Sequence, residues 1–405
     1  MDAHSMQIST VAGTGEFGHA GDGGQAAAAC LNEPKAVALD SAGNLYIADA
    51  ENHVIRKVQA ESGVITTVAG RPPGAAASAG PQSAPAAPVE GHGLDEDPLA
   101  LGEPGTTERF TQSRDLSGTV RFVTGTARKP GRVVVDGDDA AHAALQFPSS
   151  VVVDRHGNLY IADTMNHCVR VVDTRTGGAT ILAGTGRAGF SGDGGPAGSA
   201  ALNEPNALAL DDARRILYIA DQSNNRVRRV DLKTGLINTV AGTGEAAFSG
   251  DDMPAAQATL AGPSGLAVGS QGDLYIADTF NNRVRRVDAK TGLISTAAGD
   301  GGVYRYEGGE AESKSLSRPY GIAVDREDSL YITDSDSHLI RRWDRGTGRI
   351  SLVAGNGTAG FAGDGAASAD SCLSYPFGVA VAPDGAIYVA DTFNHRIRRI
   401  VRSGG

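Results

Sequence analysis

A five-residue motif that recurs at a nearly fixed interval constrains the fold of this chain more than any other feature. The motif first occurs as Leu-Tyr-Ile-Ala-Asp at residues 45–49, followed by Asn52, His53 and Arg56. Its copies end at Asp49, Asp163, Asp221, Asp278, Asp334 and Asp391. The last five aspartates lie 56 to 58 residues apart, and the first gap of 114 residues is twice 57. A constant period of this length predicts a repeat architecture.

Each repeat has the pattern of a four-stranded antiparallel meander. In residues 205–242, four short runs rich in Val, Ile and Leu are separated by Asp, Asn and Gly. One such sheet cannot bury both of its faces, so neighbouring copies must pack on one another. The last repeat lacks a fourth run, and residues 8–15 match residues 237–244. We therefore predict an all-β, six-bladed propeller in which the N-terminal strand closes the last blade and removes a free sheet edge.

The chain is expected to form a single propeller domain. We predict blades at about 34–70, 148–184, 205–242, 263–299, 319–355 and 376–402, with residues 7–13 completing the last. The Ala/Pro/Gly-rich residues 71–116 are predicted to be an insertion, either flexible or acting as a lid. Residues 117–125 resemble one extra fourth strand. Because the extra length equals one period, a degenerate seventh blade is the alternative, although the motif is missing there.

The linkers and loops carry a resemblance to a known family. Ala-Gly-Thr-Gly and Gly-Asp-Gly-Gly linkers occur together with Asp-x-x-Asn-His and Asp-x-x-Asn-Asn loops. In these features the chain resembles the NHL-repeat β-propellers, above all the bacterial form, and is similar to the NHL module of teneurins. The resemblance implies the propeller fold and leaves the function open.

Composition restricts the class of partner. The formal net charge of −11 argues against nucleic acid, because phosphate backbones require clustered Lys and Arg. The three cysteines do not suggest a disulfide framework, and no apolar run is long enough to span a membrane. We expect a monomer. The N-terminus shows no signal peptide, so we expect a cytoplasmic protein, while the extracellular location of relatives with similar linkers is the alternative.

Residues present in every repeat are predicted to be structural. The motif Asp, the loop Asn and the following Arg are expected to close loops and to join blades. Histidine and asparagine alternate at one further position: His53, His167, Asn225, Asn282, His338 and His395. The Gly-Asp-Gly-Gly linkers at 21–24 and 192–195 are expected to form turns, with calcium binding as the alternative, since neither has the spacing of a calcium loop.

The residues on either side of each opening proline break the repeat, and we predict that they surround the mouth of the central channel. They are Glu33 and Lys35, Phe147 and Ser149, Glu204 and Asn206, Gly262 and Ser264, Arg318 and Tyr320, and Tyr375 and Phe377. The four tyrosines outside the motif lie nearby in sequence: Tyr304, Tyr306, Tyr320 and Tyr375. With Arg305, Arg318 and Phe377 they are predicted to form an aromatic and cationic crescent. The alternative is that these side chains only plug the channel and pack its rim.

We predict that the propeller binds a protein, a peptide or a small molecule around the channel, on the face that carries the linkers and the Asp-x-x-Asn loops, without catalysing a reaction. The predicted binding residues are Glu33, Lys35, Phe147, Glu204, Asn206, Tyr304, Arg318, Tyr320, Tyr375 and Phe377. The alternative is an enzyme, either a lyase or a metal-dependent hydrolase, with its site at the channel mouth. Glu33, Glu204 and Asn206 are then the candidate ligands for calcium or magnesium; no other cofactor is expected.

Overall fold

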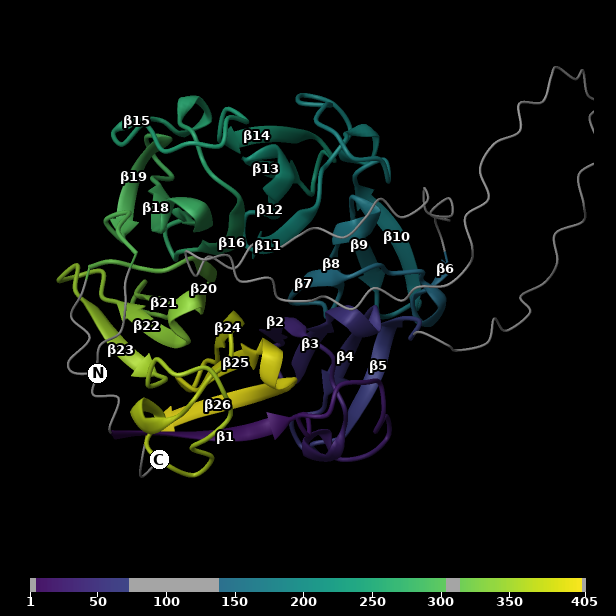
Figure 1. The fold of residues 1–405 in the computed structure, drawn as a ribbon. Coiled ribbons are helices and arrows are strands. Elements are labelled where there is room, and N and C mark those ends of the chain that lie inside the picture. The colour runs from purple at the N-terminus through teal and green to yellow at the C-terminus, as the bar shows by residue number, and fades with distance from the viewer. Residues whose placement is uncertain (1–4, 73–137, 304–313, 403–405) are drawn as a thin grey trace, which may run out of the picture. The chain divides into compact units, whose positions relative to one another are not determined.

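The computed structural model describes residues 5–72, 138–303 and 314–402 (Figure 1). The predicted strand at 117–125 and all of the predicted insertion beyond Pro72 lie outside these residues, as do Tyr304, Arg305 and Tyr306. Within the described ranges, no helix is both long enough and apolar enough to cross a membrane.

In the described part of the chain, six antiparallel sheets form the blades of a propeller, as the repeat predicts (Figure 1). The first blade consists of β2 (Pro34–Leu39), β3 (Leu45–Asp49), β4 (Val54–Val58) and β5 (Ile65–Gly70). The second consists of β7 (Pro148–Val153), β8 (Leu159–Asp163), β9 (Cys168–Asp173) and β10 (Gly178–Ala183), and the short β6 (Asp138–Asp139) pairs with β10. The third consists of β11 (Pro205–Asp211), β12 (Ile216–Asp221), β13 (Arg226–Asp231) and β14 (Ile237–Ala241).

The remaining three blades follow the same order from the channel outward. The fourth consists of β16 (Pro263–Val268), β17 (Leu274–Asp278), β18 (Arg283–Val287) and β19 (Leu293–Ala298), with the short β15 (Met253–Pro254) on β19. The fifth consists of β20 (Pro319–Val324), β21 (Leu330–Asp334), β22 (Leu339–Trp343) and β23 (Ile350–Ala354). The sixth consists of β24 (Pro376–Val381), β25 (Ile387–Asp391), β26 (Arg396–Arg402) and β1 (Met6–Ala12).

Short 3-10 helices connect these strands at two recurrent places. One set follows the second strand of each blade: η3 (Ala50–Asn52), η5 (Thr164–Asn166), η7 (Gln222–Asn224), η9 (Thr279–Asn281), η10 (Ser335–Ser337) and η12 (Thr392–Asn394). The other set lies in the linkers between blades: η2 (Ala26–Ala28), η4 (Ala140–His142), η6 (Ala197–Ser199), η8 (Ala255–Gln257) and η11 (Ser368–Asp370).

The N-terminal strand closes the propeller, which confirms the prediction from the matched sequence ends. Strand β1 runs antiparallel to β26, with Met6 opposite Arg402 and Ile8 opposite Ile400 (Figure 1). Met6 and Ile8 are fully buried in the core between the fifth and sixth blades. The hydrophobic effect therefore favours closure, because opening the propeller would expose these side chains to water.

The blades pack closely at the channel, which explains the small residues of the first strands. A β-carbon on Gly265 would collide with the carbonyl oxygen of Tyr320 in the next blade, and one on Gly321 would collide with that of Phe377. Larger apolar side chains fill the space between blades farther out; for example, Ile161 lies in one core cluster with Tyr46. The alternation of small and large residues in the sequence thus reflects the convergence of six strands on one axis.

A buried arginine fastens each of four blades to the linker that precedes it. Arg228 is completely buried, and its guanidinium lies 3.3 Å from Asp221 Oδ2 of the motif and 2.7 Å from Asp193 Oδ1 of the linker. The equivalent linker pairs are Arg56 with Asp22, Arg285 with Asp251 and Arg398 with Asp364. The aspartates of the two Gly-Asp-Gly-Gly linkers are therefore held by guanidinium groups.

Candidate functional site

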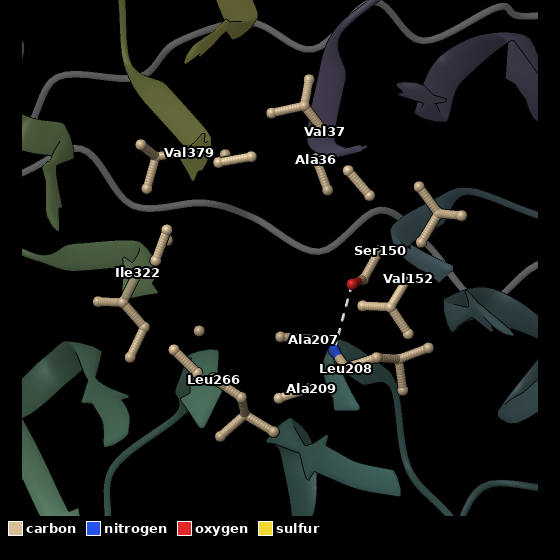
Figure 2. A pocket seen from close by; sticks show the side chains of 18 of the residues that line it. Ala36, Val37, Ser150, Val152, Ala207, Leu208, Ala209, Leu266, Ile322 and Val379 are labelled. Atoms are coloured by element: carbon tan, nitrogen blue, oxygen red, sulfur yellow. Dashed lines mark hydrogen bonds between the residues drawn. The ribbon is translucent and has the colours of Figure 1, made fainter. Parts of the chain in front are cut away.

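The first strands of all six blades surround a central cavity with a volume of about 390 Å³ (Figure 2). Figure 2 shows how adjacent first strands are joined beside it, since the N–H of Leu208 donates a hydrogen bond to Ser150 Oγ at 3.2 Å. At the start of the strands, the cavity is lined by the residues that follow the opening prolines: Lys35, Ser149, Asn206, Ser264, Tyr320 and Phe377. We call these six residues the mouth ring.

One part of the mouth ring is polar, and its side chains bind the backbone of neighbouring blades. Ser149 Oγ donates to the carbonyl of Asn206 at 2.6 Å, Asn206 Nδ2 to that of Ser264 at 2.9 Å, and Ser264 Oγ to that of Tyr320 at 3.1 Å. The phenol of Tyr320 donates to Asn206 Oδ1 at 3.0 Å. Burial raises the pKa of Tyr320 to about 12, so this phenol keeps its proton at neutral pH.

The other part of the mouth ring is aromatic. The rings of Tyr320 and Phe377 stack with centroids 4.3 Å apart. The ring centroid of Phe393 lies 6.0 Å from that of Phe377 and 5.2 Å from that of Tyr375, and both pairs have edge-on geometry. The structure thus brings together Tyr320, Tyr375 and Phe377 of the predicted crescent. Arg318 contacts different groups, with its Nε 3.4 Å from Asp336 Oδ2 and its guanidinium 5.5 Å from the ring of Phe280.

Lys35 places an ammonium group among aromatic rings. Its Nζ lies 4.2 Å from the ring centroid of Phe377, 5.4 Å from that of Phe147 and 5.7 Å from that of Phe393. The nearest carboxylate oxygen is Glu33 Oε2 at 3.5 Å. The side chain is only 8% exposed. Burial lowers the pKa of Lys35, and the carboxylates of Glu33 and Glu51 oppose that shift.

The residues that precede the opening prolines are held by the preceding blade. All six adopt left-handed backbone conformations, with φ between 47° and 55°. Each donates its N–H to the alternating His or Asn, as Glu33 does to His395 Nδ1 at 3.1 Å and Gly262 does to Asn225 Oδ1 at 2.9 Å. The His and Asn therefore have the structural role that the sequence predicts, and they fix the pre-proline residues around the mouth ring.

A second set of variable residues, missed in the sequence, lies beside the pre-proline residues. It occupies the second position after each motif aspartate: Glu51, Met165, Ser223, Phe280, Asp336 and Phe393. The N–H of Phe393, for example, donates to the carbonyl of Ser374 at 3.1 Å, which brings its ring next to Tyr375. We call these six the loop residues. Their signal in the sequence is that they vary between an aspartate and an asparagine that change little.

The three candidate metal ligands come from the first and third blades and contact different partners. Glu33 pairs with Lys35, and Glu204 Oε2 accepts a hydrogen bond from Ser223 Oγ at 2.6 Å. Asn206 Oδ1 accepts the phenol of Tyr320. In the part of the chain that the structure describes, no three His, Cys, Asp or Glu side chains are gathered as a metal ion would require. The structure does not bring these candidates together as one set of ligands.

Two family profiles match the chain. The profile for the teneurin NHL domain matches residues 5–87 and 310–401, and that for the NHL repeat matches residues 145–172 and 260–287. Every blade except the third thus carries a match to one of the two profiles.

Individual proteins show the same relationship. The chain is 31% identical over 269 residues to Protein SUPPRESSOR OF QUENCHING 1, chloroplastic, of Arabidopsis thaliana. The alignment covers 64% of this chain and 25% of that protein. It is 29% identical over 292 residues to NHL repeat-containing protein 2 of Homo sapiens, in an alignment that covers 65% of this chain and 40% of that protein. The chain therefore spans less than half the length of these curated relatives.

A solved structure shares the fold. It is described as an auxiliary nutrient binding protein from Bacteroides thetaiotaomicron, and it superposes with a TM-score of 0.61 at 15% identity over 98% of this chain and 76% of that chain. Together, the six repeated blades, the Asp-x-x-Asn loops and the two family profiles show that the chain belongs to the NHL-repeat β-propellers.

Proposed function

We propose that the mouth ring binds a small organic ligand and that the propeller does not catalyse its conversion. The observation that carries this proposal is the asymmetry of the mouth ring. Equivalent positions of six similar blades hold short polar residues in one part, and the stacked pair Tyr320 and Phe377 in another. A cavity of about 390 Å³ has the size of known small-molecule pockets, and flat aromatic walls with few polar groups suit such ligands.

The hydrogen bonds of the polar residues favour binding over catalysis. A serine nucleophile requires a base within hydrogen-bond distance. Ser149 Oγ instead contacts the hydroxyl of Thr164 and the carbonyl of Asn206, and Ser264 Oγ contacts the hydroxyl of Thr279 and the carbonyl of Tyr320. These groups hold neighbouring blades together, which gives the mouth ring a rigid backbone on which ligand contacts can be fixed.

The test is a ligand screen followed by substitution. A small-molecule library is screened against the whole chain by ligand-observed NMR, and hits are measured by titration calorimetry. Tyr320→Ala and Phe377→Leu are expected to weaken binding at least about tenfold, since each removes an aromatic wall. Leu293→Ala, on the exposed outer strand β19, is the control and should leave affinity unchanged. Equal affinity of all three variants and the unaltered protein would refute the proposal.

A further inference from the structure

The environment of Lys35 is itself that of a cation-binding site. The three aromatic rings that surround its Nζ come from two other blades: Phe147 from the second, and Phe377 and Phe393 from the sixth. All three centroids lie within about 6 Å of the nitrogen, the range in which a ring face attracts a cation. The carboxylate of Glu33 supplies the opposite charge at 3.5 Å. We call these rings and this carboxylate the ammonium cage.

The charges around the mouth favour a cation over an anion. Among the mouth ring, the pre-proline residues and the loop residues, carboxylates outnumber cations: Glu33, Glu51, Glu204 and Asp336 against Lys35 and Arg318. Arg318 is paired with Asp336. An anion approaching Lys35 would therefore meet Glu33 and Glu51, both of which interact with its ammonium group. A cation would find these two carboxylates and the negative faces of the rings.

Lys35 is suited to leave the ammonium cage. Its charge is carried by a flexible four-carbon side chain, and an ammonium group is strongly hydrated once it reaches water. Burial disfavours its charged form, which lowers its pKa. A ligand that carries an ammonium group together with a flat apolar body would replace Lys35 and would also gain contact with the Tyr320–Phe377 stack.

We propose that the ammonium cage recognises an organic ammonium group, and that Lys35 is a built-in competitor which occupies the cage until such a ligand displaces it. The inference rests on the proposed function, because it names the ligand class of the same mouth. It predicts that shortening the Lys35 side chain, which empties the cage, improves the binding of a positively charged ligand. The opposite assignment, in which Lys35 anchors a carboxylate, predicts that the same substitution abolishes binding of an anion.

The test uses two probes and two variants of the whole chain. Tetramethylammonium and butyrate are titrated against the unaltered protein, Lys35→Ala and Lys35→Met. Lys35→Ala, which empties the cage, is expected to bind tetramethylammonium at least about tenfold more tightly than the unaltered protein does, the scale of a desolvated cation–π contact. Lys35→Met keeps an unbranched side chain in the cage and should show no such gain. Absence of saturable binding to Lys35→Ala, or butyrate binding that Lys35→Ala removes, would overturn the proposal.

A second measurement uses the unaltered protein and stays decisive if Lys35→Ala fails to fold. The chain has six lysines, so the Cε–H signals of 13C-lysine-labelled protein can be resolved and assigned with Lys35→Met. The Lys35 signal should be shifted by the ring currents of its aromatic neighbours and should move toward the position of a solvated lysine as tetramethylammonium is added. A Lys35 signal that stays in place at saturating tetramethylammonium contradicts displacement.

The two proposals fail separately. Suppose that a screened ligand binds Tyr320→Ala more weakly than the unaltered protein, but binds Phe393→Leu and Lys35→Ala with unchanged affinity. This result would overturn the ammonium cage and leave the mouth ring as a binding site. A ligand whose affinity is unchanged in both Tyr320→Ala and Phe377→Leu would overturn the proposed function itself.

Discussion

His395 Nδ1 in the sixth blade accepts a hydrogen bond from the backbone N–H of Glu33 in the first blade, at 3.1 Å. The two residues are 362 positions apart in the sequence. The same bond joins His167 to Glu204 and His338 to Tyr375. In each case the imidazole accepts through Nδ1 and must be unprotonated there, so this hydrogen bond between blades depends on pH.

Mild acid is therefore expected to break these hydrogen bonds between blades and to destabilise the fold. Burial lowers the pKa of His167, His338 and His395 in the folded protein. Because the folded pKa is depressed, the stability that these histidines contribute is full above their unfolded pKa of about 6.5 and is lost as the pH falls through the folded pKa. Each lost hydrogen bond is worth about 1 kcal/mol.

A matched variant isolates this effect. Asn225 and Asn282 make the same bond in the third and fourth blades through an amide that does not titrate. Urea unfolding at pH 7.5 and pH 5 is compared for the unaltered protein and for His167→Asn, His338→Asn and His395→Asn combined. The variant should lose less stability between the two pH values. An unchanged difference would show that the histidines do not contribute.

Removal of the buried arginine of a blade should cost far more than removal of its linker partner. Arg228 is fully buried and contacts Asp221, which is also fully buried, and Asp193, whose side chain is 39% exposed. Arg228→Leu leaves the Asp221 carboxylate buried without its guanidinium, at a cost of about 3–5 kcal/mol. Asp193→Asn replaces a partly exposed carboxylate with an amide whose oxygen can still accept from Arg228, and is expected to cost about 1 kcal/mol or less. Urea unfolding measures both; similar costs for the two variants would contradict the assigned roles.

Two adjacent positions of the closing strand β1 test whether its buried side chains stabilise the propeller. Ile8 is buried opposite Ile400, whereas Gln7 next to it is exposed. Ile8→Asp places a carboxylate between two blades and is expected to destabilise the fold by more than about 3 kcal/mol. Gln7→Asp should change stability by less than about 0.5 kcal/mol. Thermal unfolding followed by circular dichroism compares them, and equal midpoints would mean that β1 does not close the propeller.

The sequence predicts the fold well because the same local rules apply six times. The motif, its period and the match of residues 8–15 to residues 237–244 depend only on which side chains a blade must bury, so blade number and closure follow from them. The mouth ring is predictable for a related reason. The proline that starts each first strand marks the channel, and residues beside it that depart from the repeat stand out.

The detailed contacts of the mouth are not predictable from one repeat. Lys35 reaches rings of the second and sixth blades, so its environment depends on how three blades meet. Phe393 joins the aromatic residues because a short 3-10 turn, η12, places it beside Tyr375. Arg318 is predicted in the crescent, but Asp336, in η10 of the same blade, is its ion-pair partner. Such contacts arise from packing between blades, which the pattern within one repeat does not encode.

A crystal structure of the protein with an amine ligand obtained from the screen tests ligand binding in the ammonium cage most directly. The ligand is expected at the mouth ring, with its ammonium group among Phe147, Phe377 and Phe393 near Glu33, and with the Lys35 side chain moved out toward solvent. A ligand bound away from the mouth ring, or one bound there while Lys35 keeps its place over Phe377, would contradict the proposed displacement.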